Sequence, residues 1–301
     1  MDKLKGIAFV SIGAASYGVL ATIVKLANNA GFGTAALTFL QFVFGVVVLS
    51  IISFFLSKKQ ENQEQKSQKY SAKYPKLKLI LFGAPLGLTS CFYYLAIQYV
   101  PVSIGIILLM QTVWMSIILE YFIDRQLVNR TKLIGAVVVL LGTVLASRIF
   151  ESDFNFSAVG FGYGFLAALS YTFTMYATNK VSVELPNITR SKYLVLGGFI
   201  AILLFWNIQI IEELNTVTLI KWGVVLGLFG TVLPPILFNN GVPKIGAGLA
   251  GILATLEIPV SILSAYFMLN ERIGILQAIG ILIILVTIIK INMQKQSTKI
   301  N

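Results

Sequence analysis

The chain of 301 residues has no histidine and a single cysteine, Cys91. A zinc or copper site is not expected without histidine or a Cys/His cluster, and no Ser-His-Asp hydrolytic triad can be assembled. One cysteine cannot form a disulfide within the chain. The sequence therefore predicts no metal, no cofactor and no enzymatic activity.

Charge is also scarce. Charged residues make up 12% of the chain, about half of the roughly 25% found in soluble domains. Hydrophobic residues reach 57%, and a soluble core cannot absorb so much apolar surface because cores stop growing at domain size. The net charge of +11 does not favour nucleic-acid binding, since the basic residues are scattered between apolar stretches. A lipid bilayer is the predicted environment.

Ten apolar stretches of about twenty residues occupy most of the chain, the length that a helix needs to cross a hydrocarbon core of about 30 Å. Helix is the expected conformer, because an open sheet would leave backbone groups unpaired in lipid. The predicted fold class is an all-α membrane protein with ten transmembrane helices. The predicted spans are Leu4–Ala27, Ala35–Leu56, Leu77–Ile97, Val102–Phe122, Leu133–Ile149, Val159–Asn179, Ser191–Ile211, Leu219–Phe238, Ile245–Met268 and Ile273–Ile291.

The chain carries an internal repeat. A Tyr-Phe pair at positions 121–122 recurs 145 positions later at 266–267, each time before a polar break and a glycine-bearing apolar stretch. We therefore predict two five-helix units, residues 1–150 and 155–293, joined in one chain. A duplicated unit of five spans is the plan of a secondary transporter.

Basic residues predict the orientation. With the N-terminus placed in the cytoplasm, 19 of the 23 lysines and arginines fall on the cytoplasmic side and 4 on the other. This bias predicts that both termini are cytoplasmic. Because five is odd, the second unit is then inverted relative to the first. The segment 57–76, rich in Lys, Gln and Glu, is predicted to be a solvated, mobile cytoplasmic loop.

Motifs in the second unit resemble those of a known family. They are GVPKIGAG from Gly241, LEIPV from Leu256 and LNER from Leu269, followed by a glycine in the last span. This pattern is similar to the C-terminal signature of the drug/metabolite transporter superfamily, EamA-like branch. The first unit carries a degraded copy, with Trp114 where Pro259 stands in the second. The resemblance implies ten helices, a central cavity at the repeat interface, and transport of small metabolites, often outward.

The resemblance also implies which helices surround the cavity. The first, third, fourth, sixth, eighth and ninth spans are expected to line it, with the fifth and tenth peripheral. Many relatives carry an arginine near the start of the second span, where the comparable polar residue here is Gln41. No mechanism that depends on that arginine is carried over.

Glu257 is the one acid deep inside a span, where a charged side chain costs about 2.5–3.5 kcal/mol or less for Glu. Pro259 follows two residues later and breaks the helix, because proline donates no backbone hydrogen bond. The carboxylate could hold a substrate amine or exchange a proton. It could equally bond backbone groups that the break leaves free, and the sequence leaves both roles open.

Other polar and aromatic groups are expected near Glu257. Repeat symmetry predicts that Gln111 faces it across the cavity, with Trp114 one turn further on; packing is the alternative for the tryptophan. Polar side chains within spans often serve only as interhelical links worth about 0.6 kcal/mol. The predicted substrate-binding residues are Tyr17, Tyr93, Gln111, Trp114, Tyr171, Asn239 and Glu257.

Two charged residues near the ends of spans are expected to have interfacial roles. Lys25 is favoured as a side chain that reaches the interface over a substrate ligand, and Glu120 is expected to pair with Arg125 at the membrane surface.

The predicted function is gradient-driven export of small organic metabolites, amino acids or related amine and aromatic compounds, across the inner or plasma membrane. No nucleotide-binding loop is present to power transport, because the glycine-rich runs follow no strand and lack the P-loop lysine. Proton coupling and facilitated diffusion remain open. The expected partners are a small solute and the bilayer, and the apolar surface of Ile273–Ile291 suits lipid or a second copy of the chain. The alternatives are a non-transporting scaffold or lipid-handling protein and, third, an ion channel.

Overall fold

The computed structural model describes residues 2–56, 74–100, 102–124, 130–146, 157–214, 218–270 and 272–297, and every regular element in these ranges is a helix. Helices of the first half are α1 (Asp2–Asn29), α2 (Thr34–Phe55), α4 (Pro75–Tyr99), α5 (Val102–Leu109), α6 (Thr112–Asp124) and α7 (Arg130–Ala146). Those of the second half are α8 (Ala158–Lys180), α9 (Asn187–Trp206), α10 (Gln209–Glu213), α11 (Thr218–Gly227), η2 (Leu228–Val232), α12 (Leu233–Ile245), α13 (Ala247–Ala254), α14 (Glu257–Leu269) and α15 (Ile275–Ser297).

Seven stretches among the described residues are long and apolar enough to cross a membrane. These are Asp2–Asn29, Thr34–Phe55, Pro75–Tyr99, Ile104–Ile123, Asn187–Trp206, Ile220–Ile245 and Ala247–Leu269. The prediction of ten spans also includes α7, α8 and α15. The described part of α7 has only 17 residues, and α15 has a shorter apolar part, Ile275–Ile291. At 23 residues α8 has the length, but it holds many hydroxyl and small side chains.

Two predicted spans are broken into half-helices. The span predicted at Val102–Phe122 is divided into α5 and α6, and that predicted at Ile245–Met268 into α13 and α14. Both breaks fall at equivalent places, since the starts of α6 and α14 differ by the 145-residue repeat offset. A proline was expected to break only the later span, so the earlier break is a feature that the sequence did not predict.

The predicted eighth span contains a π-helical turn. α11 runs into η2, which has π-helical hydrogen bonding, and then into α12. Pro234 and Pro235 lie at the start of α12, where the wider turn accommodates residues that cannot donate backbone hydrogen bonds. The π-turn was also not predicted from the sequence.

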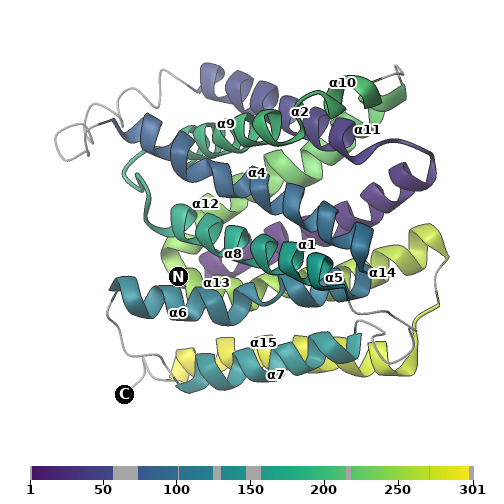
Figure 1. Ribbon diagram of the computed structural model, residues 1–301. Helices are drawn as coiled ribbons and strands as arrows, with labels where there is room; N and C mark the ends of the chain where they lie inside the picture. The colour runs from purple at the N-terminus through teal and green to yellow at the C-terminus, as the bar shows by residue number, and fades with distance from the viewer. Residues whose placement is uncertain are drawn as a thin grey trace.

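The helices pack as one bundle, in which α1 begins and α15 ends at the same end (Figure 1). α4 packs against α8 and α9, α1 packs against α12 and α14, and α7 pairs with α15 at the edge. Glycines allow the closest crossings: a Cβ at Gly87 on α4 would lie 2.2 Å from the carbonyl oxygen of Gly198 on α9. Small residues at helix crossings are the usual packing device in lipid.

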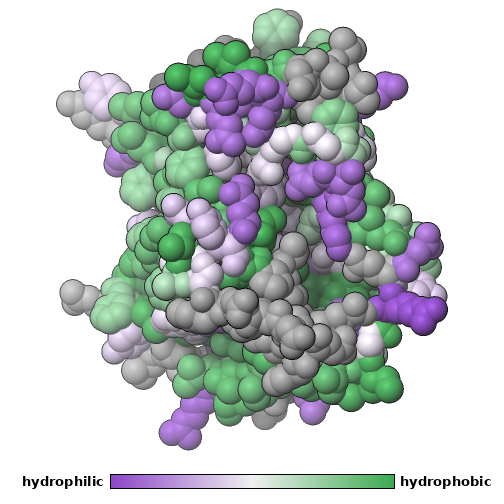
Figure 2. All heavy atoms as spheres, turned by 45° about the vertical axis from the view of Figure 1, so that its right-hand side comes forward, coloured by the Kyte–Doolittle hydropathy of each residue, from purple (hydrophilic) through white to green (hydrophobic). Residues whose placement is uncertain are grey.

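The outer surface of the edge pair is apolar. Ile134 and Leu141 on α7, with Ile275 and Leu282 on α15, are more than half exposed. Figure 2 shows hydrophobic residues over much of the visible surface and hydrophilic ones gathered on the end of the bundle that this view brings forward. The segment predicted as a mobile loop, 57–76, lies outside the described residues as far as residue 73.

Candidate functional site

A cavity of about 810 Å³ lies between the two halves of the bundle. Side chains from α1, α2, α4, α5, α8 and α14 line it, together with Gly230 of η2. It extends to the end of α1 at Asn28 and to the first turn of α2 at Thr34. α2 was not among the spans expected to line the cavity, but Thr34, Gln41 and Phe42 all line it. The ends of α7 and α15 also contribute single residues, Ala146 and Gln277.

Glu257 occupies the start of α14, at the break between two half-helices. The break has a local cause. Pro259 has no N–H to give to the carbonyl of Thr255, and that carbonyl accepts instead from Ile258 N at 3.1 Å. This shorter, 3₁₀-type bond tightens the turn and redirects the chain. As the first residue of α14, Glu257 lies where the helix dipole favours a negative charge.

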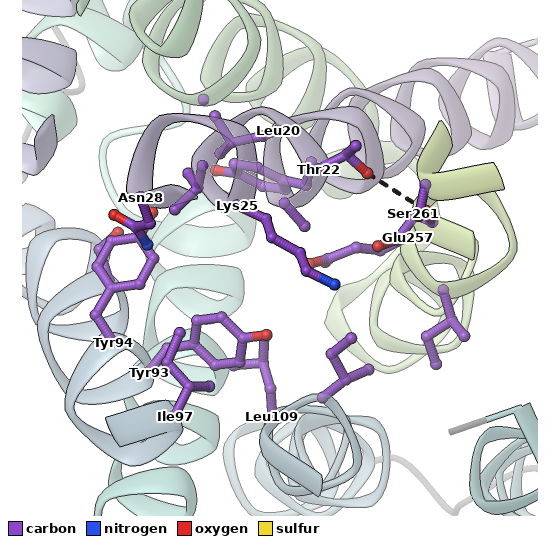
Figure 3. A pocket seen from close by; sticks show the side chains of 18 of the residues that line it. Leu20, Thr22, Lys25, Asn28, Tyr93, Tyr94, Ile97, Leu109, Glu257 and Ser261 are labelled. Carbon is purple, nitrogen blue, oxygen red and sulfur yellow. Dashed lines mark hydrogen bonds between the residues drawn. The ribbon is translucent and has the colours of Figure 1, made fainter. Parts of the chain in front are cut away.

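The Glu257 carboxylate is directed into the cavity (Figure 3). None of the hydrogen bonds between described residues involves it. Other groups pair the carbonyls at the break. Ile258 N donates to the Thr255 carbonyl, and the Thr255 hydroxyl donates to the Ile252 carbonyl at 2.7 Å. The carboxylate is therefore not needed to hold the break.

Three predicted tyrosines line the same cavity as Glu257. Tyr17 from α1, Tyr93 from α4 and Tyr171 from α8 all line it, and Tyr94 joins them. The Tyr17 and Tyr171 rings meet edge to face with centroids 6.4 Å apart. A carboxylate ringed by aromatic side chains is complementary to an organic cation.

Gln111 and Trp114 do not line the cavity, contrary to prediction. Trp114 Nε1 donates to Gln111 Oε1 at 2.8 Å, and Gln111 Nε2 donates to the Ile107 carbonyl at 3.0 Å. By the repeat offset, the residue equivalent to Glu257 is Thr112 rather than Gln111. Thr112 does not line the cavity either, and its hydroxyl hydrogen-bonds with that of Thr172 on α8 at 2.9 Å.

Asn239 is also outside the cavity. It is buried in α12, where its Nδ2 donates to Ser191 Oγ at 3.0 Å and to the Pro235 carbonyl at 2.8 Å. The second bond pairs the carbonyl of Pro235, one turn earlier in the same helix. Asn239 thus joins α12 to α9.

Arg190 is a buried residue that the sequence analysis assigned to a cytoplasmic loop. Its side chain is 1% exposed. It donates to the carbonyls of Thr178 at 2.6 Å, Val181 at 3.3 Å and Asn239 at 3.2 Å. The last carbonyls of a helix attract a cation, so Arg190 ties the end of α8 and α12 to the start of α9. The sequence places Arg190 between two predicted spans and does not show which carbonyls it meets, so this role was not predicted.

Glu120 has a partner that the sequence did not predict. Its carboxylate pairs with Lys132 Nζ at 2.7 Å, and the predicted partner, Arg125, lies outside the described residues. Glu120 lies against Gly246 and Gly248 at the start of α13, away from the cavity. Lys25 was expected to reach the membrane interface, but it lines the cavity. In Figure 3 its side chain extends into the same space as that of Glu257.

Polar cavity residues that the sequence analysis gave no binding role include Gln41 and several hydroxyl groups. Gln41 had been noted only as the polar residue of the second span. Thr22 faces α14, where its hydroxyl hydrogen-bonds with that of Ser264 (Figure 3 shows its contact with the Ser261 carbonyl). Among the described residues no group of three or more acidic, cysteine or histidine side chains could hold a metal ion.

Comparisons with known proteins agree with this architecture. The model of the EamA-like transporter family matches residues 4–148 and 158–293, one match for each half of the chain. A solved structure described only as "Crystal structure of protein" superposes with a TM-score of 0.70 at 15% sequence identity, covering 93% of this chain and 95% of that one. At this identity the likeness is one of fold. The search of curated proteins found no match.

Proposed function

Because the chain belongs to the EamA-like transporter family, an integral multi-pass membrane family, we propose that it is a gradient-driven carrier of small amine-bearing organic solutes. Amino acids, aromatic ones included, are in this class. The observation that carries the proposal is the Glu257 carboxylate, which lies at a helix break, in a cavity, among four tyrosines. Broken helices that bear the binding groups are a recurring feature of secondary transporters.

The proposed topology has ten crossings, with both termini in the cytoplasm. Two inverted five-helix units, residues 1–150 and 155–293, make up the carrier. The separate family match to each half supports the duplication, and the bias of 19 basic residues against 4 supports the orientation. The proposed location is the inner or plasma membrane, and the proposed direction is export.

The charge distribution of the cavity supports an amine as the recognised group. Glu257 is the one acid among the described residues of the cavity wall, which also includes the cations Lys25 and Arg272. An amino acid would place its ammonium against Glu257 and the aromatic faces. Sugar phosphates and nucleotide-sugars fit this arrangement poorly, because their charge is wholly negative beside a carboxylate.

The cavity also bears on the alternative functions. A scaffold or lipid-handling protein is expected to have a closed, apolar centre, whereas a carrier needs polar groups that converge within the bundle. Gln41, Glu257 and the tyrosines in the cavity wall favour the carrier.

For energy coupling, Glu257 is the proposed proton site, with facilitated diffusion as the alternative mechanism. A second copy of the chain against the exposed face of α15 is proposed as a dimer contact.

An untargeted comparison of metabolites exported by cells with and without the protein tests the proposal. The expected result is one or more amine-bearing solutes that appear in the medium only when the protein is present. A matched control is the Glu257→Gln variant expressed to the same level, which keeps the shape of the side chain and removes its charge. A sugar phosphate or nucleotide-sugar as the exported compound would contradict the proposal.

A further inference from the structure

Two amide groups in the cavity wall, those of Asn28 and Gln41, have an oxygen with no hydrogen-bond partner among the described residues. Gln41 of α2 is 3% exposed and lines the cavity, and its buried Oε1 accepts no hydrogen bond. Buried polar side chains are nearly always paired in native proteins. An unpaired amide beside a cavity marks a place where the bonding is completed by something that enters the cavity.

The backbone at Gln41 is held firmly by the π-turn. The Thr231 hydroxyl in η2 donates to the Gln41 carbonyl at 2.8 Å and to the Gly227 carbonyl at 3.0 Å. π-Turns occur often at functional sites, because they change the direction of side chains along a helix. The position of the Gln41 side chain is thus set by a local irregularity of the neighbouring helix.

Gly230, at the centre of η2, makes room for the amide. A Cβ at Gly230 would lie 2.4 Å from Gln41 Nε2, a distance at which one of the two groups would have to move. Gly230 lines the cavity as Gln41 does. The absence of a side chain at this one position therefore allows the amide to reach the cavity wall.

Gln41 and Glu257 lie on opposite flanks of α1. On one flank, Gly18 packs against the Glu257 carbonyl. On the other, Leu20 contacts Gly230, which in turn contacts Gln41. Both polar groups line the same cavity, on either side of α1.

We infer that Gln41 is a second recognition point of the cavity, which binds a carboxamide or peptide group at the far end of an elongated amine held by Glu257. A glutamine amide presents a donor and an acceptor side by side, and a carboxamide presents the complementary pair. The cavity volume of about 810 Å³ is near the upper part of the 300–1,000 Å³ range of ligand pockets, which suits such a solute. This inference rests on the proposed function.

Two probes of nearly equal length test the inference: 6-aminohexanamide, with an amine at one end and a carboxamide at the other, and n-heptylamine, with the amine alone. Binding of each is measured by titration calorimetry on the full-length protein in lipid nanodiscs, with empty nanodiscs subtracted. The quantity compared is the ratio of the two Kd values. Wild-type protein is expected to bind 6-aminohexanamide more tightly than n-heptylamine. Gln41→Met keeps the length of the side chain, and in this variant we expect that preference to fall by about ten-fold.

Controls separate the inference from the proposed function. A Kd of n-heptylamine for Gln41→Met within about two-fold of the wild-type value shows that the variant is folded. If Gln41→Met does not bind n-heptylamine, Gln41→Leu is used in its place. Glu257→Gln is expected to weaken both probes equally. An unchanged Kd ratio in the Gln41 variants would overturn the inference and leave amine binding intact. Failure of both probes to bind wild-type protein would overturn the proposed function itself, and the inference with it.

Discussion

The carbonyl oxygen of Glu257 lies against Gly18: a Cβ at Gly18 would approach it to 2.6 Å. The helix break that presents the Glu257 carboxylate is thus packed directly on α1, the helix that also carries Tyr17 and Lys25. Hydrogen bonds from Thr22 to the Ser261 carbonyl and with Ser264 continue the same contact. The position of the carboxylate in the cavity depends on this crossing.

Gly18→Ala is expected to separate α1 from α14, because the added methyl group would meet backbone atoms of α14 that cannot move aside. Overpacking of this kind costs about 1–3 kcal/mol. Thermal unfolding in detergent should show a lower Tm than wild type. The matched control is Gly162→Ala on α8, where a Cβ would meet no atom within 4 Å; its Tm should be unchanged or higher. Equal effects of the two substitutions would contradict the proposed packing.

Arg190 provides a second stability prediction. Arg190→Met would leave the carbonyls of Thr178, Val181 and Asn239 without their donor. Each buried polar group left unpaired costs about 1–3 kcal/mol, so a large fall in Tm is expected. Lys192→Met, two residues along the same helix, removes a charge from a less buried position and should change stability by less than about 0.5 kcal/mol. Wild-type stability of Arg190→Met would show that these bonds do not hold the helices together.

The location of Gln111 predicts a neutral substitution. Because its amide bonds Trp114 and the Ile107 carbonyl outside the cavity wall, Gln111→Leu should leave the transport KM within about two-fold of wild type. Tyr93→Ala, in the cavity wall, should raise KM by about ten-fold or more through loss of an aromatic face. Initial rates with the solute found by metabolite comparison measure both. A larger effect at Gln111 than at Tyr93 would restore the original prediction for Gln111.

Membrane topology is testable with single cysteines. In a Cys91→Ser background, cysteines introduced at Lys66 and at Asn301 should both be modified only after an impermeant maleimide gains access to the cytoplasm. The physical basis is the distribution of basic residues, 19 against 4. Labelling of the two positions from opposite sides would contradict an even number of crossings.

The helical membrane class and the two-fold repeat were predictable from the sequence, because apolar length and the 145-residue offset are properties of the chain itself. Glu257 was found for the same reason, as a lone acid in an apolar stretch. Tyr17, Tyr93 and Tyr171 were predicted as binding residues, and all three line the cavity with Glu257.

Features that depend on helix rotation or on other helices were not predictable. Gln111 lies at the break between α5 and α6, where it bonds Trp114 and the Ile107 carbonyl, and this break was not predicted. Arg190 is buried because carbonyls of α8 and α12 converge on it, and these come from distant parts of the chain. The π-turn and the space at Gly230 that admit Gln41 likewise result from packing between α2 and η2.

Counterflow in reconstituted vesicles tests the central claim, that this carrier recognises an amine through Glu257, most directly. Proteoliposomes loaded with unlabelled L-phenylalanine or phenethylamine are diluted into the same labelled compound, with labelled glucose 6-phosphate as the mismatched solute. The account predicts transient accumulation of an amine-bearing solute and none of the sugar phosphate. In Glu257→Gln, accumulation driven by a pH gradient should be lost, and exchange of the amine should weaken. Exchange of glucose 6-phosphate alone, or amine transport with unchanged pH dependence and affinity in Glu257→Gln, would contradict the account.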